Sequence, residues 1–162
     1  MFTCAQIKIF VELNNSVIVN VYMNSNGPVV IIEDDEDDQY FFEKIFDRLD
    51  YKNEIVFFRD GESALEYLNK SEIVPFLILS DINMPKINGF ELREKVHTNE
   101  QLNIKCIPYL FFTTASDKKS VIEAYAMSVQ GFFVKPSNLE KLESTIRKIM
   151  EYWKECIAPN EY

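Results

Sequence analysis

Five short apolar runs alternate with segments of helical periodicity over most of this chain, and this pattern limits the folds it can adopt. An apolar run without interspersed polar residues is typical of a strand buried on both faces. Such strands, each followed by a helix, predict an α/β domain with a parallel sheet covered by helices on both faces. The expected strands are residues 29–32, 55–58, 76–79, 108–113 and 132–134.

The segments after these runs carry apolar residues three or four positions apart, the spacing of one helix face. The first expected helix has Phe42, Ile45, Phe46 and Leu49, and the second follows Gly61 with Ala64, Leu65 and Leu68. A third helix is expected over residues 89–97, and a fourth, capped by Asp117, carries Val121, Ile122 and Tyr125. The last contains Leu139, Leu142, Ile146, Ile149 and Trp153.

Composition excludes several classes of function. A net charge of −9 argues against nucleic-acid binding, which needs a basic face. No apolar run is long enough to span a membrane, and a secretion signal is absent, so we expect a cytoplasmic protein. One histidine, His97, excludes a multi-histidine metal centre, and three cysteines are too few for a disulfide framework. Glycine-rich nucleotide-binding motifs are also absent.

The 162 residues suffice for one domain. We assign residues 26–156 to it and residues 157–162 to a short tail. Residues 1–25 form an N-terminal extension, in which alternating apolar residues on either side of Asn14-Asn15-Ser16 predict a β-hairpin. The extension is either native or a non-native leader, and the sequence leaves both interpretations open.

Polar residues follow the expected strands at their carboxyl ends, where an open α/β sheet binds its ligands. Clustered carboxylates raise one another's pKa unless a cation lies among them, and oxygen ligands without sulfur or imidazole suit Mg²⁺. A carboxylate beside Mg²⁺, a lysine and a hydroxyl can attack a phosphoryl group to give an aspartyl phosphate. The residues that follow the expected first, third, fourth and fifth strands are Glu33-Asp34-Asp35, Asp81, Thr113-Thr114-Ala115 and Lys135-Pro136.

The motifs VVIIEDD, LSDINMPKINGFEL, FFTTAS and GFFVKP occur in that order over residues 26–154. In this combination the chain resembles CheY-like receiver domains of response regulators. The resemblance implies a flavodoxin-like, doubly wound sheet of five parallel strands in the order 2-1-3-4-5. It also implies that residues 26–156 form a receiver domain that binds Mg²⁺.

The resemblance assigns roles to individual acidic residues. Glu33 and Asp34 match the metal-binding pair, with Asp35 as an alternative member. Asp81 matches the phosphoacceptor and a metal ligand, and Asn83 would contribute its backbone carbonyl to the metal. The remaining acids of the run, Asp37 and Asp38 among them, are expected at the N-terminus of the first helix, where negative charge is favourable.

The same resemblance covers the last two strands. Thr114 matches the switch hydroxyl, although Thr113 is adjacent, and Phe132 lies where the family has a rotating aromatic residue. Lys135 matches the lysine that pairs with the phosphoryl group. The Lys135–Pro136 bond is expected to be cis, as in the family, and to direct Lys135 toward the site.

These roles predict a stand-alone response regulator whose only reactions are self-phosphorylation and self-dephosphorylation at Asp81. The donor would be a histidine kinase or a histidine phosphotransfer protein. The output would be a protein–protein contact with a downstream partner or a second copy, in the family through the helix of Val121 and Tyr125, the last strand and the last helix. Single-domain regulators paired with phytochrome-type kinases look similar. The alternatives are a non-phosphorylated adaptor, a flavodoxin-like cofactor binder, or an aspartyl-phosphate phosphohydrolase, which would need an acid where Asn83 stands.

Overall fold

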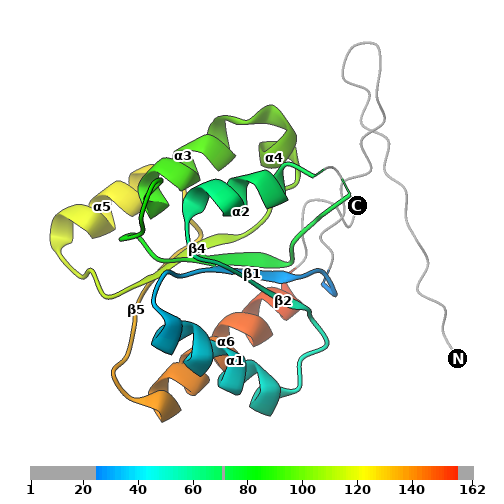
Figure 1. Ribbon diagram of the computed structural model, residues 1–162, viewed down its shortest axis with the longest axis vertical. Helices are drawn as coiled ribbons and strands as arrows, with labels where there is room; N and C mark the ends of the chain where they lie inside the picture. The colour runs from blue at the N-terminus through cyan, green and yellow to red at the C-terminus, as the bar shows by residue number, and fades with distance from the viewer. Residues whose placement is uncertain (1–24, 71, 157–162) are drawn as a thin grey trace, which may run out of the picture.

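Five parallel strands form one sheet in the order β2-β1-β3-β4-β5, as the sequence predicts (Figure 1). The computed structural model describes residues 25–70 and 72–156. Strand β1 pairs in register with both of its neighbours, with Val29 opposite Ile55 on β2 and Leu77 on β3. The strands are β1 (Val29–Ile32), β2 (Ile55–Phe58), β3 (Leu77–Ser80), β4 (Tyr109–Thr113) and β5 (Gly131–Val134).

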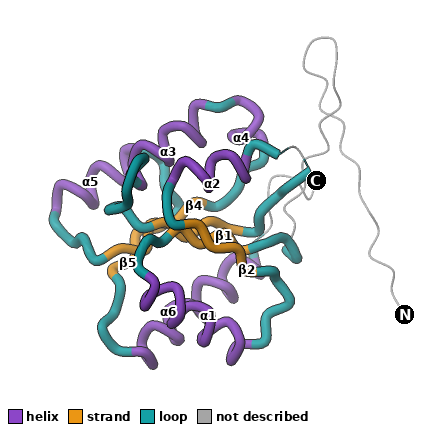
Figure 2. The backbone as a smooth tube through the Cα atoms, in the orientation of Figure 1, coloured by secondary structure: helices purple, strands orange, loops and turns teal. Residues whose placement is uncertain are grey.

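Helices cover both faces of this sheet (Figure 2). Helices α1 and α6 lie side by side on one face, and the other helices lie on the opposite face. This arrangement explains why the strands contain so few polar residues: β1, β3 and β4 are buried on both faces, and only the edge strands β2 and β5 are partly exposed. The helices are α1 (Glu36–Leu49), α2 (Gly61–Leu68), α3 (Gly89–Thr98), α4 (Glu100–Ile104), α5 (Lys118–Ala126) and α6 (Leu139–Glu155).

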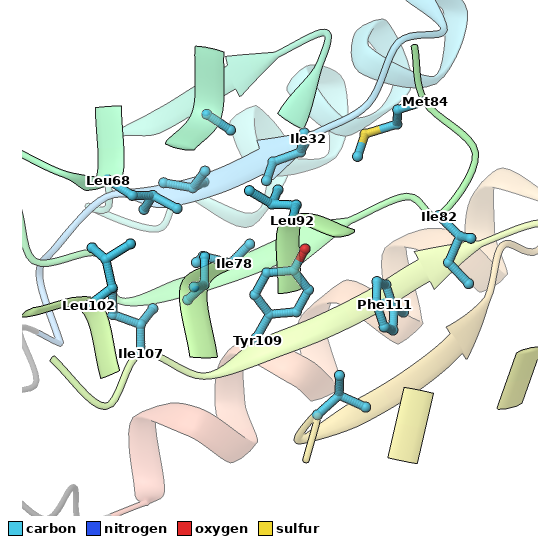
Figure 3. Close-up of a cluster of buried hydrophobic side chains, with 14 of the residues drawn as sticks. Ile32, Leu68, Ile78, Ile82, Met84, Leu92, Leu102, Ile107, Tyr109 and Phe111 are labelled. Carbon is cyan, nitrogen blue, oxygen red and sulfur yellow. The ribbon is translucent and has the colours of Figure 1, made fainter. Parts of the chain in front are cut away.

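Side chains of each strand alternate between two apolar clusters, one per face. On β1, Val30 and Ile32 join the cluster under α2 and α3, which Figure 3 shows, while Val29 and Ile31 join the cluster under α1 and α6. All four are essentially inaccessible to solvent. The strands are therefore held from both sides, and the loops at their carboxyl ends start from rigid positions.

Polar caps fix where the helices begin. Asp35 accepts hydrogen bonds from the backbone of Asp37 and Asp38 at the start of α1. Asn88 and Glu91 form a reciprocal capping box at α3. Asp117 caps α5, as predicted. The caps at α1 and α3 lie next to the loops that follow β1 and β3, so they also orient those loops.

The predicted elements agree with the structure except in details. Strand β3 starts and ends one residue later than predicted, β4 starts one residue later and β5 one residue earlier. Helix α4 was not predicted; Asn99 ends α3 and caps α4, so a single polar residue separates the two. The expected hairpin and residues 157–162 lie outside the described residues. Among the described helices, none is both long and apolar enough to cross a membrane.

Candidate functional site

The residues after β1, β3 and β5 continue the hydrogen-bond ladder of the sheet for one more step. The backbone N–H of Glu33 donates to Phe58 O (2.8 Å), that of Asp81 to Ile32 O (2.9 Å), and that of Lys135 to Thr113 O (2.8 Å). Because each backbone is pinned by a neighbouring strand, the three side chains start from fixed points at one edge of the sheet. The edge is the one at which the sequence predicted a site.

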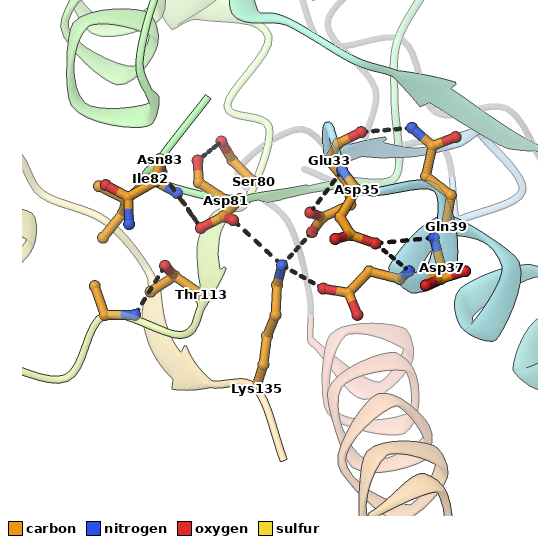
Figure 4. A network of polar contacts seen from close by, with 12 residues as sticks. Glu33, Asp35, Asp37, Gln39, Ser80, Asp81, Ile82, Asn83, Thr113 and Lys135 are labelled. Carbon is orange, nitrogen blue, oxygen red and sulfur yellow. Dashed lines mark hydrogen bonds and ion pairs between the residues drawn. The ribbon is translucent and has the colours of Figure 1, made fainter. Parts of the chain in front are cut away.

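Lys135 lies at the centre of a group of carboxylates (Figure 4). Its Nζ forms ion pairs with Glu33 Oε2, with Asp38 Oδ2 at 2.8 Å and with Asp81 Oδ2 at 3.2 Å. The Lys135 side chain is only 9% exposed, and those of Glu33 and Asp81 are 2% and 8% exposed. An ammonium group has three N–H donors, so three carboxylates use all of them.

Glu33, Asp34 and Asp81 form the candidate metal centre. One carboxylate oxygen from each lies within 4.8 Å of the other two. Glu33 and Asp81 are buried, while Asp34 is exposed and leaves one side of the cluster open to solvent. Oxygen-only donors fit a hard cation such as Mg²⁺, which keeps several of its waters and shares its coordination with a phosphate. The residues present therefore fit the metal that the sequence predicts.

The two oxygens of Asp81 have different surroundings. Oδ1 accepts the backbone N–H groups of Ile82 (2.6 Å) and Asn83 (3.4 Å), whereas Oδ2 faces Lys135. The Asp81 carbonyl accepts the Ser80 hydroxyl at 2.8 Å. Gly89 packs so closely that a Cβ atom there would lie 2.2 Å from this same carbonyl oxygen. Backbone N–H groups thus orient Oδ1 and Lys135 orients Oδ2, while the contacts of the carbonyl oxygen fix the main chain of Asp81.

The pKa values of Glu33 and Lys135 are both raised, but for different reasons. Removal from water raises the pKa of Glu33 from 4.5 to about 7, against the lowering effect of Lys135. Burial alone would lower the pKa of Lys135, but its hydrogen bonds to Asp38 and Glu33 outweigh this effect and raise it. Lys135 therefore stays a cation at neutral pH. The Glu33 carboxyl group gains or loses its proton as pH changes near neutrality.

Thr113 and Thr114 differ in position. Thr113 is fully buried at the end of β4, and its Oγ1 accepts the backbone N–H of Ala115 at 3.2 Å. Thr114 is exposed immediately after the strand, outside the network around Lys135. Phe132 is partly buried on β5 and packs edge-on against Phe111, with ring centroids 6.2 Å apart. Their roles as a switch pair stay predictions.

Two expectations about the neighbouring residues need revision. The Lys135–Pro136 bond was expected to be cis, and this was wrong: the described residues contain no cis peptide bond. Lys135 reaches the site nevertheless, because the backbone bond to Thr113 sets its start and three carboxylates hold its end. Asp35, the alternative metal ligand, is instead the N-cap of α1.

Sequence reasoning missed the contact of Asp38. It was assigned only to the first turn of α1, where it does lie, but its carboxylate also pairs with Lys135. A signal was available, since α1 begins directly after the metal-binding acids and its first turn must pass close to the site. Six acidic residues follow one another at positions 33–38, and the sequence alone does not show which of their side chains faces the site and which face solvent.

Comparisons with known proteins agree with this geometry. The family model described as "Response regulator receiver domain" matches residues 29–147. The response regulator Rcp1 of Synechocystis sp. is 30% identical over 141 residues, which cover 83% of this chain and 95% of the relative. A probable methanogenesis regulatory protein, FilR2 of Methanothrix harundinacea, is 30% identical over 129 residues, covering 77% of this chain and 82% of the relative.

Solved structures give the same result. The Mn²⁺-bound form of Rcp1 superposes with a TM-score of 0.71 at 26% identity, covering 82% of this chain and 97% of that one. A receiver domain from Rhodospirillum rubrum gives a TM-score of 0.71 at 29% identity with the same coverage. The fold and the strand order agree with these matches, and the chain belongs to the response regulator receiver domain family of two-component signalling.

Proposed function

We propose that this protein accepts a phosphoryl group on Asp81 from a histidine kinase or a histidine phosphotransfer protein. The observation that carries this proposal is the orientation of Asp81, a buried carboxylate with Oδ1 held by backbone N–H groups and Oδ2 facing Lys135 at 3.2 Å. A carboxylate fixed in this way is ready to act as a nucleophile.

In the proposed reaction an Asp81 carboxylate oxygen attacks phosphorus. A new oxygen–phosphorus bond forms, the bond from phosphorus to the donor breaks, and the leaving group departs with its electron pair. Lys135 stabilises the negative charge on the phosphoryl oxygens. Glu33, Asp34 and Asp81, with the Asn83 backbone carbonyl, would hold Mg²⁺, which when bound offsets further charge on those oxygens.

Phosphorylation would then bias a two-state surface. The proposed switch residues are Thr114, directly after β4, and Phe132 on β5. The surface proposed from the family comprises α5, β5 and α6, and three of its large apolar side chains are exposed. These three, which lie on α5 and β5, are Ile122 (58%), Tyr125 (56%) and Val134 (50%), and on α6 Tyr152 (62%) is exposed as well. The output partner would be a downstream protein or a second copy of this chain, in the cytoplasm.

The test is incubation with acetyl phosphate, with and without Mg²⁺, followed by intact-mass measurement. We expect one added phosphoryl group that requires both Mg²⁺ and Asp81, so that Asp81→Asn gives none. Asp37→Asn is the matched control, because it removes the same charge from an exposed position in the first turn of α1. If no adduct forms and beryllofluoride with Mg²⁺ also fails to bind, the chain is a receiver-shaped adaptor and the proposal is wrong.

A further inference from the structure

Asp38 is a partner of Lys135 that the proposed reaction does not use. It lies in the first turn of α1, its side chain is 35% exposed, and its Oδ2 lies 2.8 Å from Lys135 Nζ. The other two carboxylates on Lys135 have roles already: Glu33 belongs to the candidate metal cluster, and Asp81 is the proposed phosphoacceptor. Asp38 therefore needs a separate explanation.

The hydrogen-bond capacity of Lys135 creates a competition. Its three N–H donors are all committed, one to each carboxylate. To contact a phosphoryl group, Lys135 must release at least one of them. Metal binding to Glu33 and Asp81 would free two of these donors, but Asp38 lies outside the metal cluster and would still hold Nζ on its own side of the site.

The charge balance acts in the same direction. With Mg²⁺ bound, the carboxylates of Glu33, Asp34, Asp38 and Asp81 carry one more negative charge than the metal and Lys135 offset. Every phosphoryl donor is itself an anion, so this excess repels it. Without Asp38 the site would be neutral. Asp38 thus both holds the cation that the phosphoryl group needs and adds the charge that opposes its approach.

We propose that Asp38 is a positioning residue that restrains phosphorylation of Asp81 by holding Lys135 away from the incoming phosphoryl group. The inference rests on the proposed function and adds to it a built-in limit on the rate. The simpler explanation, that Asp38 only stabilises the N-terminus of α1 as a first-turn acid, predicts no effect on phosphoryl acceptance beyond that of its neighbour Asp37.

The experiment compares Asp38→Asn with Asp37→Asn in the full chain with Mg²⁺. Both variants lose one negative charge from the same helical turn, but only Asp38 touches Lys135. We expect Asp38→Asn to accept phosphate from acetyl phosphate about threefold to tenfold faster than Asp37→Asn, the range for one partly screened charge near the site. The affinity for beryllofluoride, an equilibrium measure, should rise by a similar factor.

A second phosphoryl donor distinguishes an effect of the Asp38 charge on phosphorylation from a change in the structure of α1. Acetyl phosphate is a dianion near neutral pH, whereas phosphoramidate carries less negative charge, so the gain of Asp38→Asn should be smaller with phosphoramidate. Thermal unfolding of both variants identifies any loss of α1. Equal rates for the two variants, or a slower Asp38→Asn, would overturn the role proposed for Asp38 alone. Failure of the unaltered protein to accept phosphate or beryllofluoride would overturn the proposed function itself.

Discussion

The raised pKa of Glu33 predicts a stability that declines as pH rises when metal is absent. Glu33 is 2% exposed, and burial raises its pKa from 4.5 to about 7. The folded protein therefore holds this proton more tightly than the unfolded chain does. The resulting stabilisation is complete below about pH 4.5 and is lost as pH rises through about 7.

The size of the effect follows from the two pKa values. Each pKa unit corresponds to about 1.4 kcal/mol, so the shift from 4.5 to about 7 is worth about 3 kcal/mol in all. Between about pH 5 and about pH 8 the free energy of unfolding should fall by about 2.5 kcal/mol from this group. Mg²⁺ should oppose the decline, because it binds the ionised carboxylate of the folded protein.

The assay is urea unfolding in EDTA at several pH values, for the unaltered protein and for Glu33→Gln. The amide has a similar shape and does not titrate, so the variant should lack this decline, whatever its absolute stability. Mg²⁺ affinity of the unaltered protein should rise about tenfold per pH unit up to about pH 7 and then level off. Parallel pH curves for the two proteins, together with an affinity for Mg²⁺ that does not change with pH, would refute the reasoning.

Three further substitutions test contacts around the site. Gly89→Ala should lower the free energy of unfolding by about 1–3 kcal/mol, because a Cβ atom would lie 2.2 Å from Asp81 O; urea unfolding measures this, and an unchanged midpoint would contradict the close approach. Arg93→Met should cost about 2–3 kcal/mol in the same assay, since the buried guanidinium donates to Met127 O and Ser128 O, and no loss would mean that these bonds contribute nothing. Asp35→Ala should cost about 1 kcal/mol as a lost N-cap while leaving Mg²⁺ affinity, measured by calorimetry, unchanged; a large loss of affinity would restore Asp35 as a ligand.

The sheet could be predicted because the apolar runs that form its strands are hard to interpret in any other way. Runs such as 29–32 are apolar at every position, and a strand buried on both faces is the simplest structure for them between helices. The convergence of Glu33, Asp81 and Lys135 followed from the same pattern, since parallel strands end at one edge. Strand order came from the resemblance of the motifs, because alternation alone does not specify which strands are neighbours.

Details at the site depended on where α1 begins, and the sequence did not determine that. Within the acidic run 33–38, each residue type could ligate a metal, cap a helix or face solvent. Once Asp35 takes the N-cap position, Asp38 falls in the first turn on the side of Lys135. The isomer of the Lys135–Pro136 bond was likewise not determined by the local sequence, because an X–Pro bond can adopt either the cis or the trans form.

The acidic run therefore serves separate purposes through its position relative to one cation. Glu33 is buried, and its raised pKa makes its charge change near neutral pH. Asp38 is partly exposed, so its carboxylate pairs with Lys135 without a comparable loss of hydration free energy. Of the acids that pair with Lys135, Glu33 and Asp81 belong to the candidate metal cluster and Asp38 does not. With metal bound, Asp38 is thus the acid that still holds Lys135, and a substitution there should change the rate of phosphorylation without removing any ligand or nucleophile.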